Sequence, residues 1–317
     1  MENMNVSRGE EVREQIRRTR HRMEVKLYAA CIILGLMAAC LLVFFITDDF
    51  EPVEELKEFL GMFGLSAEKP DFGALLLILL VLIGIIGGIG SIILMLVVYL
   101  FTVYSQYASQ LSYSVRVSEK NFPEIYQKVK EYTELLDLPK EPEVFVQQMN
   151  GELNAFTCWV PGRIFIQLNA EIVDLAYMEN KDFDTVYFIM AHEMGHAYLH
   201  HVQLQYAVWC MLINFIPVLG QYILFPLLSR SREYSADRVA QALTGGTSEL
   251  EAMMLLSAGR HAYKYLSPQD YLRDITRKRN PVERFAVRMV NLLATHPIMP
   301  YRTQAILDPG KKSGKLL

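Results

Sequence analysis

Residues 192–196 read His-Glu-Met-Gly-His and lie in the apolar stretch Phe-Ile-Met-Ala-His-Glu-Met-Gly-His-Ala, residues 188–197. In a helix, residues four apart share one face, so His192 and His196 can reach the same metal ion. Glu193 lies about 100° around the helix from His192, where it can hold a metal-bound water instead of binding the metal. Because buried histidines beside a glutamate need partners, this stretch favours a metal site over a surface helix.

A catalytic zinc site needs a third protein ligand, which must come from elsewhere in the chain. His200 lies about 12 Å along the helix axis from His192, too far for one ion. We expect His200 and His201 only to end the helix, where its dipole favours them. The next polar helix carries Glu233 and Asp237 four residues apart. Glu233 could complete a His-His-Glu site and Asp237 could hold the outer nitrogen of a liganding histidine, the alternative being a solvated charged face.

The composition indicates a membrane protein with a folded polar part. Hydrophobic residues make up 52% of the 317 residues and charged residues 21%, which is too apolar for a disordered chain. The formal net charge of −4 argues against a nucleic-acid partner. The four cysteines lie far apart in the sequence, which excludes a small disulfide-linked scaffold.

Two apolar stretches, 27–46 and 72–104, are each long enough to cross a bilayer. Basic residues dominate 1–26 and return after 104, whereas the loop between the stretches is acidic. The positive-inside rule predicts a basic cytoplasmic arm (1–26), two transmembrane helices with an acidic external loop (27–104) and a cytoplasmic domain (105–317). A cleaved lipoprotein signal is the alternative, which the continuation of the apolar run beyond Cys40 disfavours.

The domain is predicted to be mainly α with a small β-sheet. Helical patterns cover 122–136, 170–178, 183–201, 232–243, 248–259 and 281–293, and strand patterns cover 143–148, 152–159 and 163–167. A third apolar stretch, 204–228, is too short to cross a bilayer twice, and a single crossing would separate Glu233 from His192. We therefore expect a re-entrant or interfacial hairpin there, divided at Pro217 and Gly220.

The chain resembles the HtpX-type membrane metalloproteases and, more distantly, the CAAX prenyl endoproteases. The resemblance rests on four motifs, which are 192–196, Glu233 with Asp237, Asn154-Ala155-Phe156 and Thr295-His296-Pro297. It implies an α+β gluzincin-type metalloprotease domain behind a transmembrane helical hairpin. It also implies one Zn²⁺ per chain, with His192, His196 and Glu233 as ligands.

The same resemblance implies roles for the other site residues. Glu193 would be the general base, and Asp237 would orient a liganding histidine. His296 and Arg302 would face the scissile carbonyl or the substrate, the alternative for His296 being a satisfied core histidine. The substrate would pair with an edge strand that contains Asn154, Ala155 and Phe156.

The function that the resemblance implies is zinc-dependent endoproteolysis of membrane or misfolded proteins at the cytoplasmic face of a membrane, the bacterial inner membrane by analogy. The expected partners are polypeptide substrates and the lipid bilayer. Residues 157–159 read Thr-Cys-Trp, where the family usually has small residues, so substrate preference is not carried over. Two alternatives stay open: a prenyl-protein endopeptidase, and a zinc-stabilised membrane scaffold without turnover.

Overall fold

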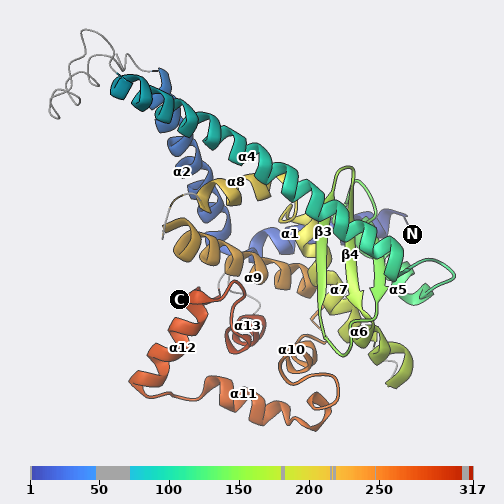
Figure 1. The fold of residues 1–317 in the computed structure, drawn as a ribbon. Coiled ribbons are helices and arrows are strands. Elements are labelled where there is room, and N and C mark those ends of the chain that lie inside the picture. Colours follow the sequence, from blue (N-terminus) through green and yellow to red (C-terminus); the bar gives the residue numbers. More distant parts are fainter. Residues whose placement is uncertain are drawn as a thin grey trace. The chain divides into compact units, whose positions relative to one another are not determined.

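Four short strands form a mixed sheet in the order β1-β2-β4-β3, and Figure 1 shows β4 beside β3. β2 (Glu143–Gln147) is parallel to β4 (Arg163–Asn169), and both β1 (Val115–Arg116) and β3 (Ala155–Val160) are antiparallel to their neighbours. The three predicted strands are confirmed with shifted ends, whereas β1 was not expected. β3 is an edge strand of the described sheet, and edge strands offer unpaired backbone groups.

The structure is a computed structural model that describes residues 2–47, 72–179, 183–214, 216, 219–246, 248–308 and 314–316. The chain forms two compact units, one of Met1–Ile32 with Gln106–Leu317 and the other of Ile33–Ser105. The predicted acidic loop, 48–71, lies outside the described residues. Residues predicted to form a separate N-terminal arm therefore belong to the same unit as 192–196.

The larger unit is mostly helical, as predicted. Its α-helices are α1 (Glu2–Thr19), α5 (Pro123–Leu136), α6 (Ala170–Asp174), α7 (Phe183–Tyr198), α8 (Leu204–Asn214), α9 (Phe225–Thr244), α10 (Glu249–Ala258), α11 (Pro268–Thr276), α12 (Pro281–Leu293) and α13 (Met299–Ile306). Two π-helical segments, η1 (Leu175–Glu179) and η2 (Leu219–Leu224), and the 3₁₀ turn η3 (Tyr263–Tyr265) complete it. α1, α11 and α13 were not expected from the sequence.

α7 and α9 pack against each other in the core of this unit, and Gly195 permits their close approach. A Cβ atom at Gly195 would lie 3.0 Å from Cβ of Val239 and 3.2 Å from Cα and the carbonyl oxygen of Ala236. Gly195, Ala236 and Val239 are all buried. The core therefore lies directly beneath the helix faces that carry the polar residues 192–196 and Glu233.

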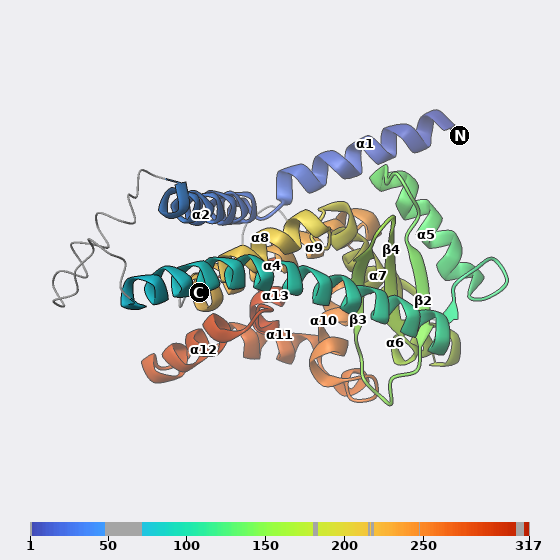
Figure 2. The same cartoon turned by 45° about the horizontal axis from the view of Figure 1, so that its top comes forward.

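The basic N-terminal segment is a helix that packs on α5 and α9, and Figure 2 shows α1 beside α5. Val12 and Ile16 of α1 are buried. Arg13 Nη1 donates a hydrogen bond to the carbonyl oxygen of Leu135 at 3.0 Å. At least one arginine of the predicted topology signal thus also holds the fold together.

Both long apolar stretches are helical, in α2 (Arg22–Thr47) and α4 (Phe72–Tyr113). α4 continues beyond residue 104, and its end joins the larger unit, where Tyr107 Oη donates to Glu143 Oε2 at 2.9 Å. Within the described residues, one stretch, Ile93–Tyr113, is long enough and apolar enough to cross a membrane. This stretch overlaps the second predicted span by length and composition only, so the two-span hairpin stays a prediction.

The third apolar stretch contains two helical segments, α8 and η2, and η2 continues directly into α9. α9 begins at Phe225, so the helix that carries Glu233 starts inside the apolar stretch instead of at residue 232. Of the two predicted breaks, Pro217 lies outside the described residues. Gly220 lies inside η2 and is buried, so it does not divide the stretch.

Candidate metal centre

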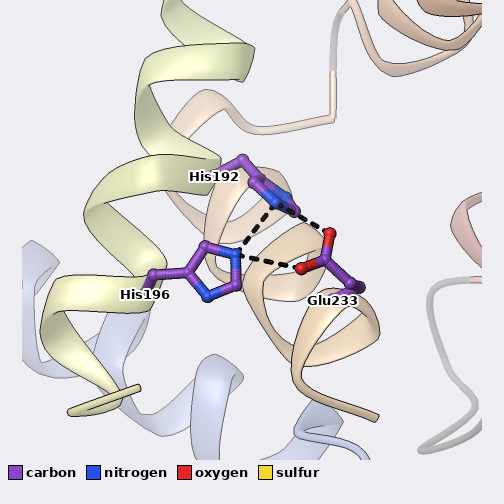
Figure 3. Close-up of side chains that lie close together, drawn as sticks. All are labelled: His192, His196 and Glu233. Carbon is purple, nitrogen blue, oxygen red and sulfur yellow. Dashed lines mark hydrogen bonds and ion pairs between the residues drawn. The ribbon is translucent and has the colours of Figure 1, made fainter. Parts of the chain in front are cut away.

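α7 and α9 bring the imidazoles of His192 and His196 together with the carboxylate of Glu233 (Figure 3). All three side chains are buried, and one ligand atom from each lies within 4.8 Å of the others. Nε2 of His192 lies 3.5 Å from Glu233 Oε2, and Nε2 of His196 lies 3.4 Å from Glu233 Oε1. The two Nε2 atoms are 3.2 Å apart. Both rings therefore direct Nε2 to a common point and leave Nδ1 for other partners.

This donor set fits a zinc ion, because two imidazole nitrogens and one carboxylate oxygen are ligands that catalytic zinc takes while keeping a position for water. Burial favours the neutral form of Glu233, but hydrogen bonds with His192, His196 and His296 outweigh it and hold the pKa of this carboxyl well below its usual range. Glu233 is therefore a carboxylate at neutral pH and can offset part of a cation's charge.

Asp237 orients His192. Nδ1 of His192 donates to Asp237 Oδ1 at 2.8 Å, which leaves Nε2 as the atom free to bind a metal. Arg302 donates to both oxygens of Asp237, from Nη2 at 2.6 Å and from Nε at 3.0 Å. Burial raises the pKa of Asp237, but Arg302 and the hydrogen bond from His192 outweigh it, so the pKa is lowered.

His196 has a longer chain of partners, which the sequence reasoning missed. Its Nδ1 lies 2.9 Å from Nδ1 of His201, and Nε2 of His201 lies 2.9 Å from Glu24 Oε1. Glu24 also forms an ion pair with Arg20. His201 and Glu24 are only 3% and 1% exposed, so the contacts that connect His196 with Glu24 are shielded from solvent.

The protonation states of His201 and Glu24 agree with the hydrogen bonds that connect His196, His201 and Glu24. Burial lowers the pKa of His201 to about 3 in spite of Glu24, so its imidazole is neutral. Burial disfavours ionisation of Glu24, yet contacts with His201 and Arg20 lower its pKa to about 2. Neutral His201 can therefore accept a hydrogen bond from His196 at Nδ1 and donate one to the Glu24 carboxylate at Nε2. His201 follows the end of α7, as expected, but it is a buried partner of His196.

A cleft of about 230 Å³ is lined by two of the three candidate ligands, His192 and Glu233. It is bordered by Glu193, by Asn154 and Ala155, and by His296 and Arg302. Of the predicted site residues, His196, Asp237 and Phe156 do not line this cleft. His196 and Asp237 lie behind it, in contact with Glu233 and His192 respectively. Arg302 borders the cleft, but its guanidinium is bound to Asp237, so it is less available to a substrate than expected.

β3 presents alternate residues to opposite sides, as strands do. Ala155 borders the cleft, whereas the ring of Phe156 packs edge-on against Phe165 with centroids 6.1 Å apart. Thr157 returns to the site: its Oγ1 lies 2.7 Å from Oε2 and 2.9 Å from the carbonyl oxygen of Glu193, and can donate to either. From the sequence, Thr157 was noted only because the family usually has a small residue at this position, and its contact with Glu193 was not predicted.

His296 lies at the mouth of the cleft. Its side chain is 68% exposed, so the alternative of a buried core histidine is wrong. Its Nδ1 lies 3.2 Å from Glu233 Oε2, and this hydrogen bond raises the pKa of His296. The imidazole can therefore carry a proton toward a molecule in the cleft.

The model of peptidase family M48 matches residues 119–309, which include α7, α9 and all three candidate ligands. Searches of curated proteins and of solved structures returned no match. The family covers both HtpX-type and CAAX proteases, and its members generally depend on zinc. Because the match covers more than half of the chain, and the His-His-Glu cluster lies within it, the protein belongs to peptidase family M48 and is a metallopeptidase.

Proposed function

We propose that the protein is a membrane-anchored zinc endopeptidase that cuts membrane or misfolded proteins at the cytoplasmic face of a membrane. The observation that carries this proposal is the buried cluster of His192, His196 and Glu233, with Glu193 beside His192 and Glu233 in the adjoining cleft. The family supports a metallopeptidase. The apolar stretches and the charge bias around them support the anchoring and the topology.

The residues around the cleft suit peptide hydrolysis. A zinc ion at this site would supply Lewis acidity and lower the pKa of water. Glu193 is placed to accept a proton from the attacking water and to pass it to the leaving amine. His296 can donate a hydrogen bond to the substrate carbonyl oxygen as negative charge develops there. β3, whose Ala155 borders the cleft, offers an edge along which an extended substrate can pair.

Replacing the base tests the catalytic part. Purified Glu193→Gln protein should retain about one zinc per chain, measured by plasma mass spectrometry, because Glu193 lies outside the ligand cluster. Its casein cleavage in detergent should fall by about 10² to 10⁴. Glu10→Gln, at an exposed position of α1, is the matched control and should cleave like the parent.

Two outcomes contradict this assignment. Undiminished cleavage by Glu193→Gln removes Glu193 from the reaction, and zinc-loaded parent protein without any cleavage makes the site a structural scaffold.

A farnesylated peptide included as a competing substrate separates the two protease classes. General endoproteolysis predicts cleavage of casein without a prenyl group, whereas strict dependence on the prenyl group contradicts it.

The membrane topology is tested separately. We infer that 204–228 returns to the side from which it left, since His192 and Glu233 face one site. Single cysteines at Gln203 and Ser229 should therefore react with a membrane-impermeant thiol reagent from the same side of sealed vesicles. Labelling from opposite sides contradicts the hairpin. In bacterial cells this side should be the cytoplasm, and the membrane the inner membrane.

A further inference from the structure

α12 presents its apolar face away from the body of the larger unit. Four apolar side chains are largely exposed: Val282 (77%), Phe285 (65%), Val290 (61%) and Leu293 (65%). Asn291 is fully buried, and its side chain donates to the carbonyl oxygen of Leu316 at 3.2 Å. Because successive residues are rotated by about 100°, Asn291 lies roughly opposite the apolar face. A helix of a soluble domain normally has the reverse orientation.

A capping box defines the start of α12, and contacts with the rest of the unit at its other end fix its orientation. At the start, Asn280 and Glu283 form a capping box, with Glu283 N donating to Asn280 Oδ1 at 2.8 Å and Asn280 N to Glu283 Oε2 at 3.1 Å. At the end, Arg230 of α9 donates to the carbonyl oxygens of Leu292 at 3.0 Å and Ala294 at 2.6 Å. The outward apolar face is therefore held in place by the core helix α9.

The same segment is basic in a chain that is acidic overall. Residues 277–293 contain five cationic residues and one anionic residue (Arg277, Lys278, Arg279, Arg284, Arg288 and Glu283), so their net charge is 5 − 1 = +4, against −4 for the whole chain. Arg277 and Lys278 are exposed. A helix with an apolar face and a basic flank is typical of segments that lie in a membrane interface, where anionic lipids attract the cations.

A second exposed apolar group lies near α12. η2 exposes Leu219 (41%), Tyr222 (53%) and Ile223 (40%), and it continues into α9, whose Arg230 holds the end of α12. Figure 1 shows the start of α9 and the end of α12 on the same side of the larger unit. Within the described residues, two exposed apolar groups thus lie at one end of this unit, on η2 and on α12. The group on α12 is the one with several basic residues beside it in the sequence.

We propose that α12 lies in the headgroup region of an anionic lipid bilayer, with Phe285, Val290 and Leu293 directed into the lipid and the exposed Arg277 and Lys278, just before the helix, near the lipid phosphates. Charge complementarity favours lipid over a polypeptide partner, because three consecutive basic residues, 277–279, directly precede the helix with this apolar face. α12 leads through residues 294 and 295 to His296, so this contact places the mouth of the cleft beside the bilayer. The proposal concerns lipid contact and does not depend on catalysis.

Photocrosslinking tests the lipid contact in the full-length protein. The photoreactive residue benzoylphenylalanine replaces Phe285 or Val290, and the protein is reconstituted in vesicles of phosphatidylglycerol and phosphatidylcholine. Arg284, on the opposite side of α12, is the matched control position. After irradiation, mass spectrometry should find phospholipid adducts at Phe285 and Val290 at about five times the yield at Arg284. Adducts to this chain, adducts to another polypeptide, or the absence of adducts would each overturn the proposal.

A second measurement tests the role of charge. Replacing Arg277, Lys278 and Arg279 together by glutamate should lower the lipid adduct at Phe285 about fivefold in the anionic vesicles. The parent should show a similar loss in vesicles of phosphatidylcholine alone. Equal yields under these conditions would overturn the preference for anionic lipid. Zinc content measured on the same samples shows that the variant is folded, and a failure of proteolysis with lipid adducts retained would count against the proposed function alone.

Discussion

Glu24, near the start of α2, lies 2.9 Å from Nε2 of His201, 177 residues further along the chain. His201 contacts His196, so both candidate histidine ligands are connected to a buried carboxylate: His192 directly to Asp237, and His196 to Glu24 through His201. Each carboxylate is in turn paired with an arginine. Such partners fix the tautomer and the ring orientation of a metal ligand. The N-terminal segment is therefore structurally part of the candidate metal centre.

Glu24→Gln should weaken zinc binding by about 10- to 100-fold, because His201 loses its anionic acceptor and no longer holds the His196 ring firmly. The measurement is a competition for zinc with a chromophoric chelator. Glu14→Gln, which removes an exposed carboxylate that pairs with Arg18 in α1, is the matched control and should bind zinc like the parent. Unchanged affinity in Glu24→Gln would remove the N-terminal segment from the metal centre.

The acid stability of the metal-free protein should depend on Glu24. Its pKa of about 2 lies below the ordinary value of about 4.3, so its ionisation stabilises the folded state above the ordinary pKa. This stabilisation is lost as the pH falls through the window between the two values. The difference in unfolding free energy between parent and Glu24→Gln should therefore shrink by up to about 3 kcal/mol between pH 5 and pH 2, as denaturant titrations can measure. A difference independent of pH contradicts this.

Asp237→Asn should be among the more damaging single substitutions, because it removes the carboxylate that accepts two hydrogen bonds from the buried guanidinium of Arg302. We expect a loss of about 3 to 5 kcal/mol in stability together with weaker zinc binding. Adding Arg302→Met should restore most of the stability, since no unpaired charge is left, but should not restore zinc affinity. Thermal unfolding with and without zinc measures both effects. A double variant no more stable than Asp237→Asn would argue against this pair as the cause.

Thr157→Val should slow catalysis without removing zinc. Valine matches threonine in shape but cannot donate to Glu193, and one hydrogen bond to a charged group corresponds to roughly a tenfold effect on kcat. The measurements are kcat, KM and zinc content. Thr157→Ser retains the hydroxyl and should recover most of kcat. If serine and valine variants are equally slow, the effect comes from packing and not from the hydrogen bond.

Gly195→Ala should separate α7 from α9, because the added Cβ meets backbone atoms of Ala236 that cannot rotate away. We expect a loss of about 1 to 3 kcal/mol in stability and a matching decrease in zinc affinity, since Glu233 comes from α9. Met194→Leu, a substitution of similar volume in the same buried helix, is the control. A fully stable, fully zinc-binding Gly195→Ala protein would mean that the helices adjust at no cost.

Local pattern by itself determined much of this protein. The helix with His192, Glu193 and His196, the strands and the extent of α12 follow from the spacing of polar and apolar residues, which acts over neighbouring positions. Four-residue spacing also places His192 with His196, and Glu233 with Asp237, on one face of its own helix. That these two faces meet at one site was expected from the family resemblance and not from the spacing.

Only the tertiary structure decided which distant groups complete the site. Nothing in the spacing of residues connects Glu24 with His201, or assigns Arg302 to Asp237, because hydrogen bonds between remote segments leave no periodic trace in a sequence. The sequence shows that α12 is amphipathic, but this pattern does not determine which face of the helix points away from the body of the unit. That direction depends on where Asn291 and Arg230 anchor the helix, and the packing of the whole unit sets those contacts.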